Sequence, residues 1–252
     1  LEDFNSQQKL REANEKLRLT NVALKEANKV IQKELTSAHA IQKKLLPKTF
    51  PMHLMHDVAS HYESTNRVGG DYYDCFELEP GKLAMVIADV SGHGVSAALI
   101  MSMFKVLLKT KSKKYSLPSE TIEAINKAFV EEVQSEHFVT LFYGIFDTAT
   151  RVLTYTSSGH DPVILLDKEN SIKQLTSTQA IIGAFGDLKC VDNQVELDAD
   201  SRMVLFTDGI VEAKNGDGKM YSLDRLIEKT YEFAQIGCED FLQKLLKDHF
   251  DF

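Results

Sequence analysis

The sequence predicts an α+β domain with layered elements, preceded by one long helix. Residues 2–46 contain neither Gly nor Pro and carry apolar residues at intervals of seven, as coiled coils do. After Pro51 the pattern changes to short strands in hairpins, with helices in pairs between them, which favours an α+β domain. The 252 residues, 43% of them hydrophobic, are enough for one sizeable core and an extension. We therefore predict a coiled-coil dimerisation and linker helix over residues 1–46 and a folded domain over residues 47–252.

The long helix is expected to pair with a second copy of itself. Its seam consists of Leu10, Leu17, Leu24 and Ile31 at one core position, with Asn14, Asn21 and Asn28 at the other. Asn at this position lowers stability but favours a parallel, in-register pair. A single amphipathic helix lying on the domain is the alternative, but so narrow an apolar stripe has little to bury there. Pro47 and Pro51 end the helix.

Charge and cysteine content restrict the classes of function. Residues 1–46 hold nine Lys and Arg against six Asp and Glu, whereas the remainder holds twenty against thirty-one. The folded domain is therefore acidic, which argues against a nucleic-acid binder or a nuclease. Cys75, Cys190 and Cys238 match no paired or zinc-binding spacing, so reduced thiols in the cytoplasm are expected.

The chain shows no targeting segment. No apolar run reaches the roughly 18 residues that suggest a membrane span, and there is no signal peptide. Because the chain begins at Leu1 rather than Met, we expect a fragment of a longer protein, such as the cytoplasmic part of a sensor.

One stretch, MVIADVSGHG, carries most of the expected chemistry. Its apolar start predicts a buried strand that stops at Asp89, and Gly92 and Gly94 predict a turn into a helix over Val95–Lys111. A carboxylate at the end of a buried strand, beside exposed backbone carbonyls, offers the oxygen ligands that hard divalent cations take. An Asp that only caps the turn is the alternative.

Two other stretches place acids in similar positions. VGGDYYD puts Asp71 and Asp74 just after two glycines that allow the backbone to bend. MVLFTDG repeats the order of apolar strand, Asp208 and Gly. Three such carboxylates, Asp71, Asp89 and Asp208, suit a site for two divalent metal ions, which can activate water and clamp a phosphoryl group.

The remaining elements follow from hairpin and helix patterns. The expected strands are 56–64, 76–78, 83–88, 139–146, 152–157, 163–166, 195–197 and 203–207. The expected helices are 95–111, 120–133, 222–230 and 239–249. His160 lies in a loop that contains Gly and Pro, where it is either a general acid or, as loop histidines more often are, a hydrogen-bonding strut.

Five motifs, in this order, resemble the PPM metal-dependent serine/threonine phosphatases, the protein phosphatase 2C type: VGGDYYD, ADVSGHGVSAALIMS, SSGHDPVIL, IIGAF and LFTDGIVEA. The most similar branch is the bacterial SpoIIE and RsbU-like one, and LLPKTFP at residues 45–51 resembles the segment that leads into its domain. The resemblance implies two stacked antiparallel β-sheets flanked by helices. It also implies hydrolysis of phosphoserine or phosphothreonine on a protein, with Mn²⁺ or Mg²⁺ as cofactor.

The resemblance further implies the roles of the site residues. Asp89 is expected to bridge two metal ions. The carbonyl of Val90 and the carboxylate of Asp71 are expected on one ion, and Asp208 on the other. The nucleophile would be metal-bound water, so no Ser or Cys nucleophile is required.

Other acidic and basic residues are less firmly placed by the resemblance. Asp74 is expected to support a turn or a neighbouring ligand, and Arg67 either binds phosphate bidentately or is a solvated surface residue. The family normally closes with an Asp-Asp-hydrophobic-Thr strand whose Asp completes a metal site. This chain ends in DHFDF, where Asp248 and Asp251 do not fit that strand. We therefore expect a C-terminally truncated domain with one incomplete metal site.

The resemblance points to a phosphorylated anti-anti-sigma-like protein as substrate. The heptads suggest that an upstream sensor domain acts through a parallel homodimer, shifting the helices 95–111 and 120–133 and with them Asp71 and Asp89. The alternative is a catalytically weak phosphatase fold that binds a partner while the coiled coil dimerises it. The three acids argue against this alternative, and the missing terminal strand argues for it.

Overall fold

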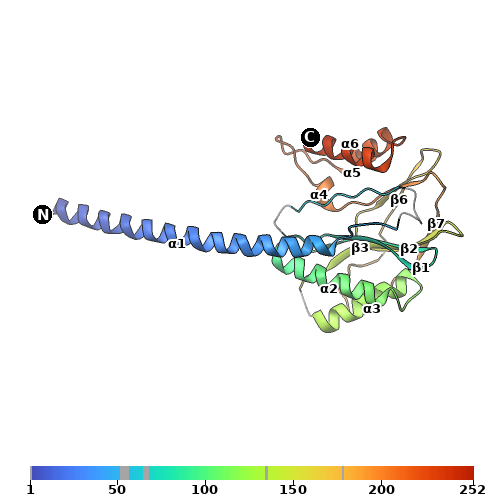
Figure 1. The fold of residues 1–252 in the computed structure, drawn as a ribbon, viewed down its shortest axis with the longest axis horizontal. Coiled ribbons are helices and arrows are strands. Elements are labelled where there is room, and N and C mark those ends of the chain that lie inside the picture. Colours follow the sequence, from blue (N-terminus) through green and yellow to red (C-terminus); the bar gives the residue numbers. More distant parts are fainter. Residues whose placement is uncertain (1, 52–56, 65–67, 134–135, 178) are drawn as a thin grey trace. The chain divides into compact units, whose positions relative to one another are not determined.

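A computed structural model describes residues 2–51, 57–64, 68–133, 136–177 and 179–252, with side chains from residue 7 onward (Figure 1). The chain divides into two compact units, residues 1–43 and 44–252. Arg67, for which phosphate binding was one interpretation, lies outside the described residues.

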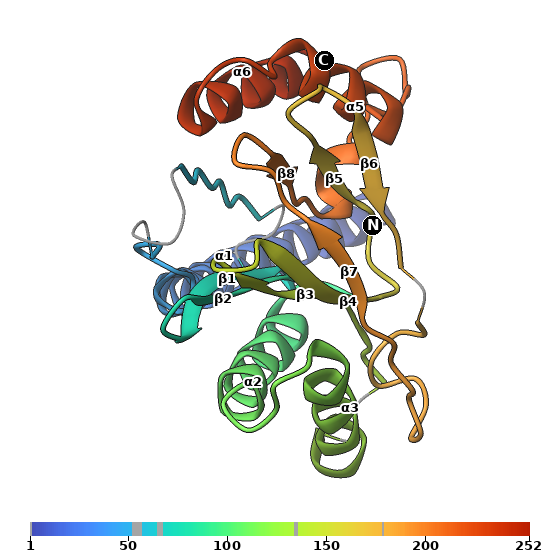
Figure 2. The same ribbon diagram turned by 90° about the vertical axis from the view of Figure 1, so that its right-hand side faces the viewer.

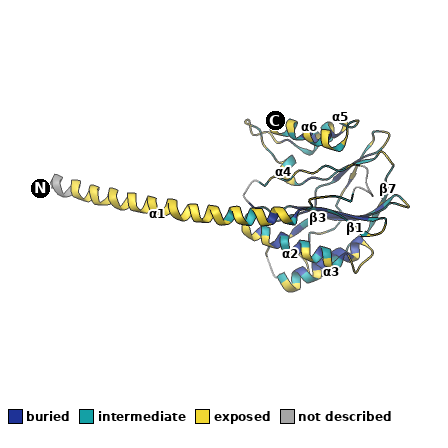
Figure 3. Ribbon diagram, viewed as in Figure 1, coloured by how far each residue is buried: buried dark blue, intermediate teal, exposed yellow. Residues whose placement is uncertain are grey.

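The first unit contains all but the last two residues of α1 (Glu2–Leu45), which confirms the long helix predicted there. Figure 3 shows exposed residues along nearly all of this helix. The apolar residues of the predicted seam, Leu10, Leu17, Leu24 and Ile31, are 54% to 62% exposed in the single chain. Helices in water are stabilised mainly by packing of an apolar face, so pairing along this seam stays a prediction. Within the described ranges, no helix combines the length and the apolar composition needed to cross a membrane.

The larger sheet of the second unit has five strands in the order β1–β2–β3–β4–β7, with all neighbours antiparallel. The strands are β1 (Tyr72–Glu79), β2 (Lys82–Val90), β3 (Val139–Asp147), β4 (Val152–Ser158) and β7 (Asn193–Glu196). Hairpins set the register, since Glu79 pairs with Lys82 across the predicted Pro-Gly turn. Gly81 in that turn has φ +83°, a left-handed conformation that favours glycine.

The smaller sheet has three antiparallel strands in the order β6–β5–β8. They are β6 (Ile172–Leu175), β5 (Val163–Leu166) and β8 (Arg202–Val204). This sheet stacks on the larger one (Figure 2), and apolar side chains between them, such as Ile87, Phe142 and Leu165, form a core. The predicted pair of stacked antiparallel sheets is therefore confirmed.

Helices cover the outer faces of the two sheets, also as predicted (Figure 2). The larger sheet is covered by α2 (Val95–Lys111) and by α3 (Pro118–Ala128), which continues as a π-helical turn over Phe129–Val133. The smaller sheet is covered by α5 (Leu223–Glu232) and α6 (Cys238–Asp251). The helices predicted from apolar periodicity were thus correct to within a few residues.

The structure corrects the strand predicted over residues 56–64. Its described part, 57–64, contains no strand. Asp57 instead accepts a hydrogen bond from the backbone N–H of Cys238 at the start of α6. Because the N-cap residue Gly237 has no side chain, Asp57 supplies the cap from a distant part of the chain.

Other elements also differ from the prediction, and β1 begins at Tyr72 instead of at residue 76. β6 was missed, because two of its four residues are exposed and its apolar pattern is weak. The strand predicted to reach residue 207 ends at Val204, and Asp208 begins the short helix α4 (Asp208–Val211). β2 continues through Asp89 to Val90, because both residues still pair with β3.

Candidate active site

The register of the larger sheet brings Asp71 and Asp89 together. Asp89 pairs with Thr140 of β3, and β1 pairs with β2 so that Asp71, the residue before β1, falls beside Asp89. Because side chains alternate along a strand, Asp89 shares the inner face of the sheet with Ile87, which contacts the core between the sheets. Both acids therefore lie at one end of the space between the two sheets.

The smaller sheet supplies Thr207 and Asp208 to the same place. The chain leaves β8 in an extended conformation, and Asp208 follows Thr207 as the first residue of α4. Thr207 Oγ1 donates a hydrogen bond of 2.8 Å to Oδ2 of Asp71, which joins the two sheets. Three acids predicted from separate stretches, Asp71, Asp89 and Asp208, are thus brought together by the fold.

These acids repel one another in a partly buried site. Burial raises the pKa of Asp89 to about 8, and a hydrogen bond with Asp71, the charge of Asp71 and the charge of Asp208 add to this shift. Burial also raises the pKa of Asp208, together with repulsion from Asp71, Glu212 and Asp161. Such a group of carboxylates is stabilised by a proton or by a cation between them.

Asp161 and Glu212 were not predicted as site residues. Burial raises the pKa of Asp161, and the charge of Glu212 contributes to the shift. Two signals in the sequence could have identified them. Asp161 follows His160 directly, and Glu212 lies four residues after Asp208, a spacing that places two side chains on one side of a helical turn.

Gly70 allows the backbone to approach the carbonyl group of Val90. A Cβ atom at position 70 would lie 2.5 Å from the Val90 carbonyl oxygen and 3.2 Å from Oδ1 of Asp89. No residue with a side chain fits this position without a shift of the backbone. The glycine pair before Asp71 therefore serves close approach at Gly70 rather than only a bend of the chain.

Asp74 faces away from the site, so the expectation that it supports a turn or a neighbouring ligand was wrong. Asp74 lies within β1, on the face that packs against α2. Its carboxylate accepts a hydrogen bond of 2.8 Å from the Tyr72 hydroxyl and forms an ion pair with Lys109 of α2, also at 2.8 Å. Asp74 therefore ties the sheet to its covering helix.

His160 is a buried strut between the sheets. Its Nδ1 lies 3.1 Å from Oγ1 of Thr140, and its Nε2 lies 3.2 Å from the carbonyl oxygen of Phe206. Both ring nitrogens are thus hydrogen-bonded within the protein, as the strut alternative predicted.

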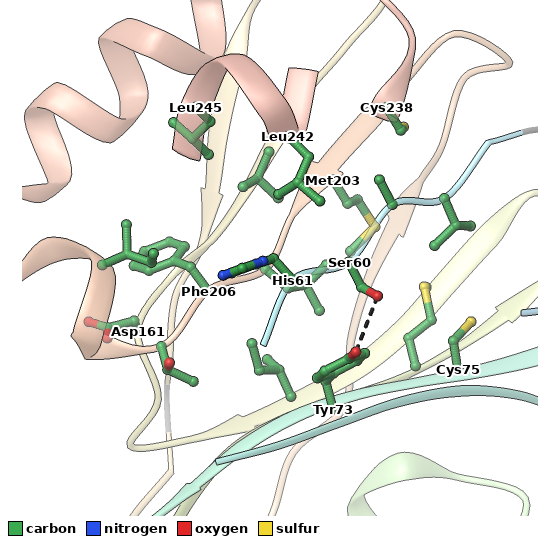
Figure 4. Close-up of a pocket in the computed structure, with 18 of the residues that line it drawn as sticks. Ser60, His61, Tyr73, Cys75, Asp161, Met203, Phe206, Cys238, Leu242 and Leu245 are labelled. Carbon is green, nitrogen blue, oxygen red and sulfur yellow. Dashed lines mark hydrogen bonds between the residues drawn. The ribbon is translucent and has the colours of Figure 1, made fainter. Parts of the chain in front are cut away.

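The acids open into a cleft of about 1830 Å³ in the second unit. Asp71, Asp89 and Asp208 line it together with apolar residues of β8 and α6. Figure 4 shows Met203, Leu242 and Leu245 on one wall and Tyr73 with Cys75 on the opposite wall. Tyr73 also contacts Ser60 through their hydroxyl groups, which are 3.2 Å apart. The cleft therefore combines an acidic region with a largely apolar one.

The donor groups of the site fit divalent metal ions by their chemistry. Across the part of the chain that the structure describes, no three His, Cys, Asp or Glu side chains stand at the spacing of a bound ion. Asp71, Asp89, Asp208 and the Val90 carbonyl nevertheless offer only oxygen atoms, which Mg²⁺ and Mn²⁺ prefer. Burial and repulsion from Asp71 and Asp208 raise the pKa of Asp89, so a cation between these carboxylates would stabilise its charged form.

Two stacked antiparallel sheets between helices define the fold of PP2C-type phosphatase domains, and solved structures agree. The SiaA-PP2C domain of Pseudomonas aeruginosa has a TM-score of 0.79 at 18% identity, over 90% of this chain and 92% of that chain. The PP2C phosphatase domain of SpoIIE from Bacillus subtilis, with a fragment of its regulatory domain, has a TM-score of 0.58 at 19% identity, over 71% of this chain and 52% of that chain. At these identities, what is shared is the fold.

The chain belongs to the family of Stage II sporulation protein E (SpoIIE), whose sequence profile matches residues 79–251. The phosphoserine phosphatase RsbU of Bacillus subtilis is 28% identical over 221 residues, which is 86% of this chain and 66% of RsbU. Protein IcfG of Synechocystis sp. is 29% identical over 248 residues, which is 86% of this chain and 39% of IcfG. The chain spans less than two-thirds of the length of either relative. The resemblance to the SpoIIE and RsbU-like branch is confirmed.

Proposed function

We propose that this chain is a metal-dependent protein serine/threonine phosphatase. The observation that carries the proposal is the convergence of Asp71, Asp89 and Asp208, from three distant stretches, in one cleft between the sheets. Membership of the SpoIIE family supports it, as does the name of the relative RsbU, a phosphoserine phosphatase.

Each residue of the site has a proposed part. Asp71, Asp89, Asp208 and the Val90 carbonyl would hold Mn²⁺ or Mg²⁺. Such ions, when bound, lower the pKa of a water molecule and stabilise charge on a phosphoryl group. Thr207 orients Asp71 through its hydrogen bond, and Gly70 leaves room for the Val90 carbonyl.

The proposed substrate is a phosphoserine or phosphothreonine on a signalling protein of the anti-anti-sigma type. A phosphorylated substrate and the acidic site repel each other, so the cations would also be needed to admit the phosphate. The proposed location is the cytoplasm, where three cysteines without a disulfide are expected.

The long helix α1 is proposed to form a parallel homodimer and to transmit the state of an upstream sensor. Four apolar residues of its seam are more than half exposed in the single chain. Burying them against a second copy removes apolar area from water, which favours association.

The test is Mn²⁺-dependent release of phosphate from a phosphoserine peptide by this chain. Asp89→Asn and Asp208→Asn should each lower the rate on the order of 100-fold or more, as loss of electrostatic stabilisation does. The matched control is Asp147→Asn. Asp147 ends β3 and accepts hydrogen bonds from the N–H groups of Ala149 and Thr150, away from the site. Turnover that persists in chelator, or in both site variants, would refute the proposal.

One observation favours a second candidate, a phosphatase fold that binds a partner without turnover. Among the described residues, the site acids are not at the spacing of a bound ion. Binding of a phosphorylated partner with no release of phosphate, at any Mn²⁺ concentration, would establish this second function.

A further inference from the structure

We infer that His160 is a positioning residue, an imidazole strut that sets the separation of the two sheets at the acidic site. This inference rests on the proposed function, because the separation matters for holding cations. His160 is 6% exposed and lies between the sheets. It follows β4 of the larger sheet and contacts the chain that leaves β8 of the smaller one.

The hydrogen bonds determine which nitrogen carries the proton. The Phe206 carbonyl oxygen only accepts hydrogen bonds, so Nε2 at 3.2 Å must carry a hydrogen and donate it. Burial lowers the pKa of His160 to about 4, so the ring is neutral at physiological pH. In a neutral ring Nδ1 is then the acceptor, and the Thr140 hydroxyl donates to it across 3.1 Å.

Each end of the strut is next to a site acid. Thr140 pairs directly with Asp89 in the ladder between β2 and β3. On the other side, Phe206 is followed by Thr207, which holds Asp71, and by Asp208. A change in the length or direction of this strut would therefore move Asp89 relative to Asp208.

The loop that carries His160 is held in place from both sides. Gly159 has φ +65°, and a Cβ atom there would lie 2.2 Å from Cγ2 of Ile181, so only glycine fits. The Gly159 N–H donates to Oγ of Ser177 at 2.6 Å. A side chain that positions others must itself be fixed, and this loop meets that requirement.

Thr140→Val should lower Mn²⁺ affinity, because it removes the hydroxyl that donates to Nδ1 of His160 but keeps the shape of the side chain. The expected loss is roughly 10-fold, as for other groups that orient metal ligands. Thr140→Ser should restore the affinity, since it keeps the hydroxyl. His160→Gln should lose affinity to a similar degree, because one amide cannot reach both partners.

The matched control is Thr156→Val, a second threonine of the same sheet, which is buried whereas Thr140 is half-buried. Its hydroxyl contacts Oε1 of Gln179 at 3.3 Å instead of facing the site. Calorimetric titration with Mn²⁺ and denaturant unfolding are measured on all variants. Equal Mn²⁺ affinity in Thr140→Val and wild type would overturn the inference, as would an equal loss of affinity in Thr156→Val.

A second measurement is independent of metal binding and of turnover. In the metal-free wild type, the ¹⁵N NMR spectrum of the His160 ring should show Nε2 protonated and Nδ1 as an acceptor. In Thr140→Val the Nδ1 signal should shift towards that of a nitrogen without a hydrogen bond. A ring protonated on Nδ1 would refute the strut, whether or not the chain is a phosphatase. A wild type that shows the expected spectrum but no turnover would refute only the proposed function.

Discussion

Oγ1 of Thr207 and Oδ2 of Asp71 lie 2.8 Å apart, and this hydrogen bond joins the segment after β8 of the smaller sheet to the residue before β1 of the larger sheet. Thr207 precedes α4, and Asp71 precedes β1. Because this hydrogen bond holds Oδ2, the protein orients the Asp71 carboxylate before any ligand binds.

Removal of the Thr207 hydroxyl should weaken cation binding more than it weakens the fold. Thr207→Val is expected to raise the Mn²⁺ dissociation constant roughly 10-fold, because Asp71 is no longer oriented. The free energy of unfolding should fall by only about 1 kcal/mol, the usual contribution of one hydrogen bond. Calorimetry and urea unfolding give both values. Thr207→Ser is the control, and a loss of Mn²⁺ affinity in that variant as large as in Thr207→Val would contradict the assignment.

Gly70→Ala should disturb the site through the backbone. Its new methyl group would meet the Val90 carbonyl oxygen at 2.5 Å, so one of the two chains must shift. We expect a loss of about 1–3 kcal/mol in the free energy of unfolding, as for overpacked cores. Phosphate release should also fall.

Gly216→Ala is the matched control for this change. A Cβ atom at Gly216 meets nothing within 4 Å, and its φ is not positive. If Gly70→Ala and Gly216→Ala unfold at the same denaturant concentration, close approach at Gly70 is not the reason for the glycine.

The metal-free protein should lose stability as pH rises. Folded Asp89 keeps its proton up to about pH 8, whereas the unfolded chain releases it near the ordinary value of 3.8. The folded state therefore binds more protons across this interval, and the free energy of unfolding decreases with increasing pH. Asp89→Asn removes this dependence.

At pH 8 the metal-free Asp89→Asn variant should be more stable than wild type. We expect roughly 2 kcal/mol, after allowance for the solvent that reaches this half-buried group. Mn²⁺ should raise the melting temperature of wild type but not of the variant. The comparison is with Asp217→Asn in an exposed turn. If Asp89→Asn is less stable than wild type at pH 8, then burial and the nearby carboxylates do not make ionised Asp89 unfavourable in the folded state.

The ion pair of Asp74 with Lys109 should matter for stability and not for metal binding. Asp74 is 7% exposed, and Lys109→Met leaves its carboxylate buried without a cation. Burial lowers the pKa of Lys109 in spite of the adjacent carboxylate, so burying the pair has a free-energy cost. Removing only one partner costs more, because the other charge is then buried without compensation. The free energy of unfolding should fall by roughly 3 kcal/mol.

Replacement of both partners, Asp74→Asn with Lys109→Met, should recover part of that loss, because no charge is then left buried alone. Mn²⁺ affinity should stay at the wild-type value in the single and double variants. A marked fall in affinity would place Asp74 among the groups that support the site.

Pairing of α1 should depend on the seam and not on hydrophobicity in general. Changing Leu17, Leu24 and Ile31 to Lys should convert a dimer to a monomer, as measured by light scattering, and should change the phosphatase rate. The control changes three apolar residues off the seam to Lys, namely Leu19, Val22 and Val30, which are also more than half exposed. The control should stay dimeric. Unchanged mass and rate in the seam variant would refute both pairing and regulation through it.

Local periodicity was enough to predict much of this protein. The seven-residue spacing predicted α1, and turn sequences such as Glu79-Pro80-Gly81-Lys82 predicted the hairpins. Apolar strands that lead to Asp89 and Asp208 predicted the acids of the site, because backbone preference and side-chain alternation act between near neighbours in the chain.

What the tertiary structure alone decided was which distant side chains meet. Asp74 turned out to face α2 because the strand β1 begins at Tyr72, and strand register determines the face of every residue. Asp161 and the strut His160 come close to Asp208 and Phe206 because two separate sheets stack, which no spacing in the sequence encodes. Contacts between remote segments depend on the packing of whole layers, and only the folded chain specifies that packing.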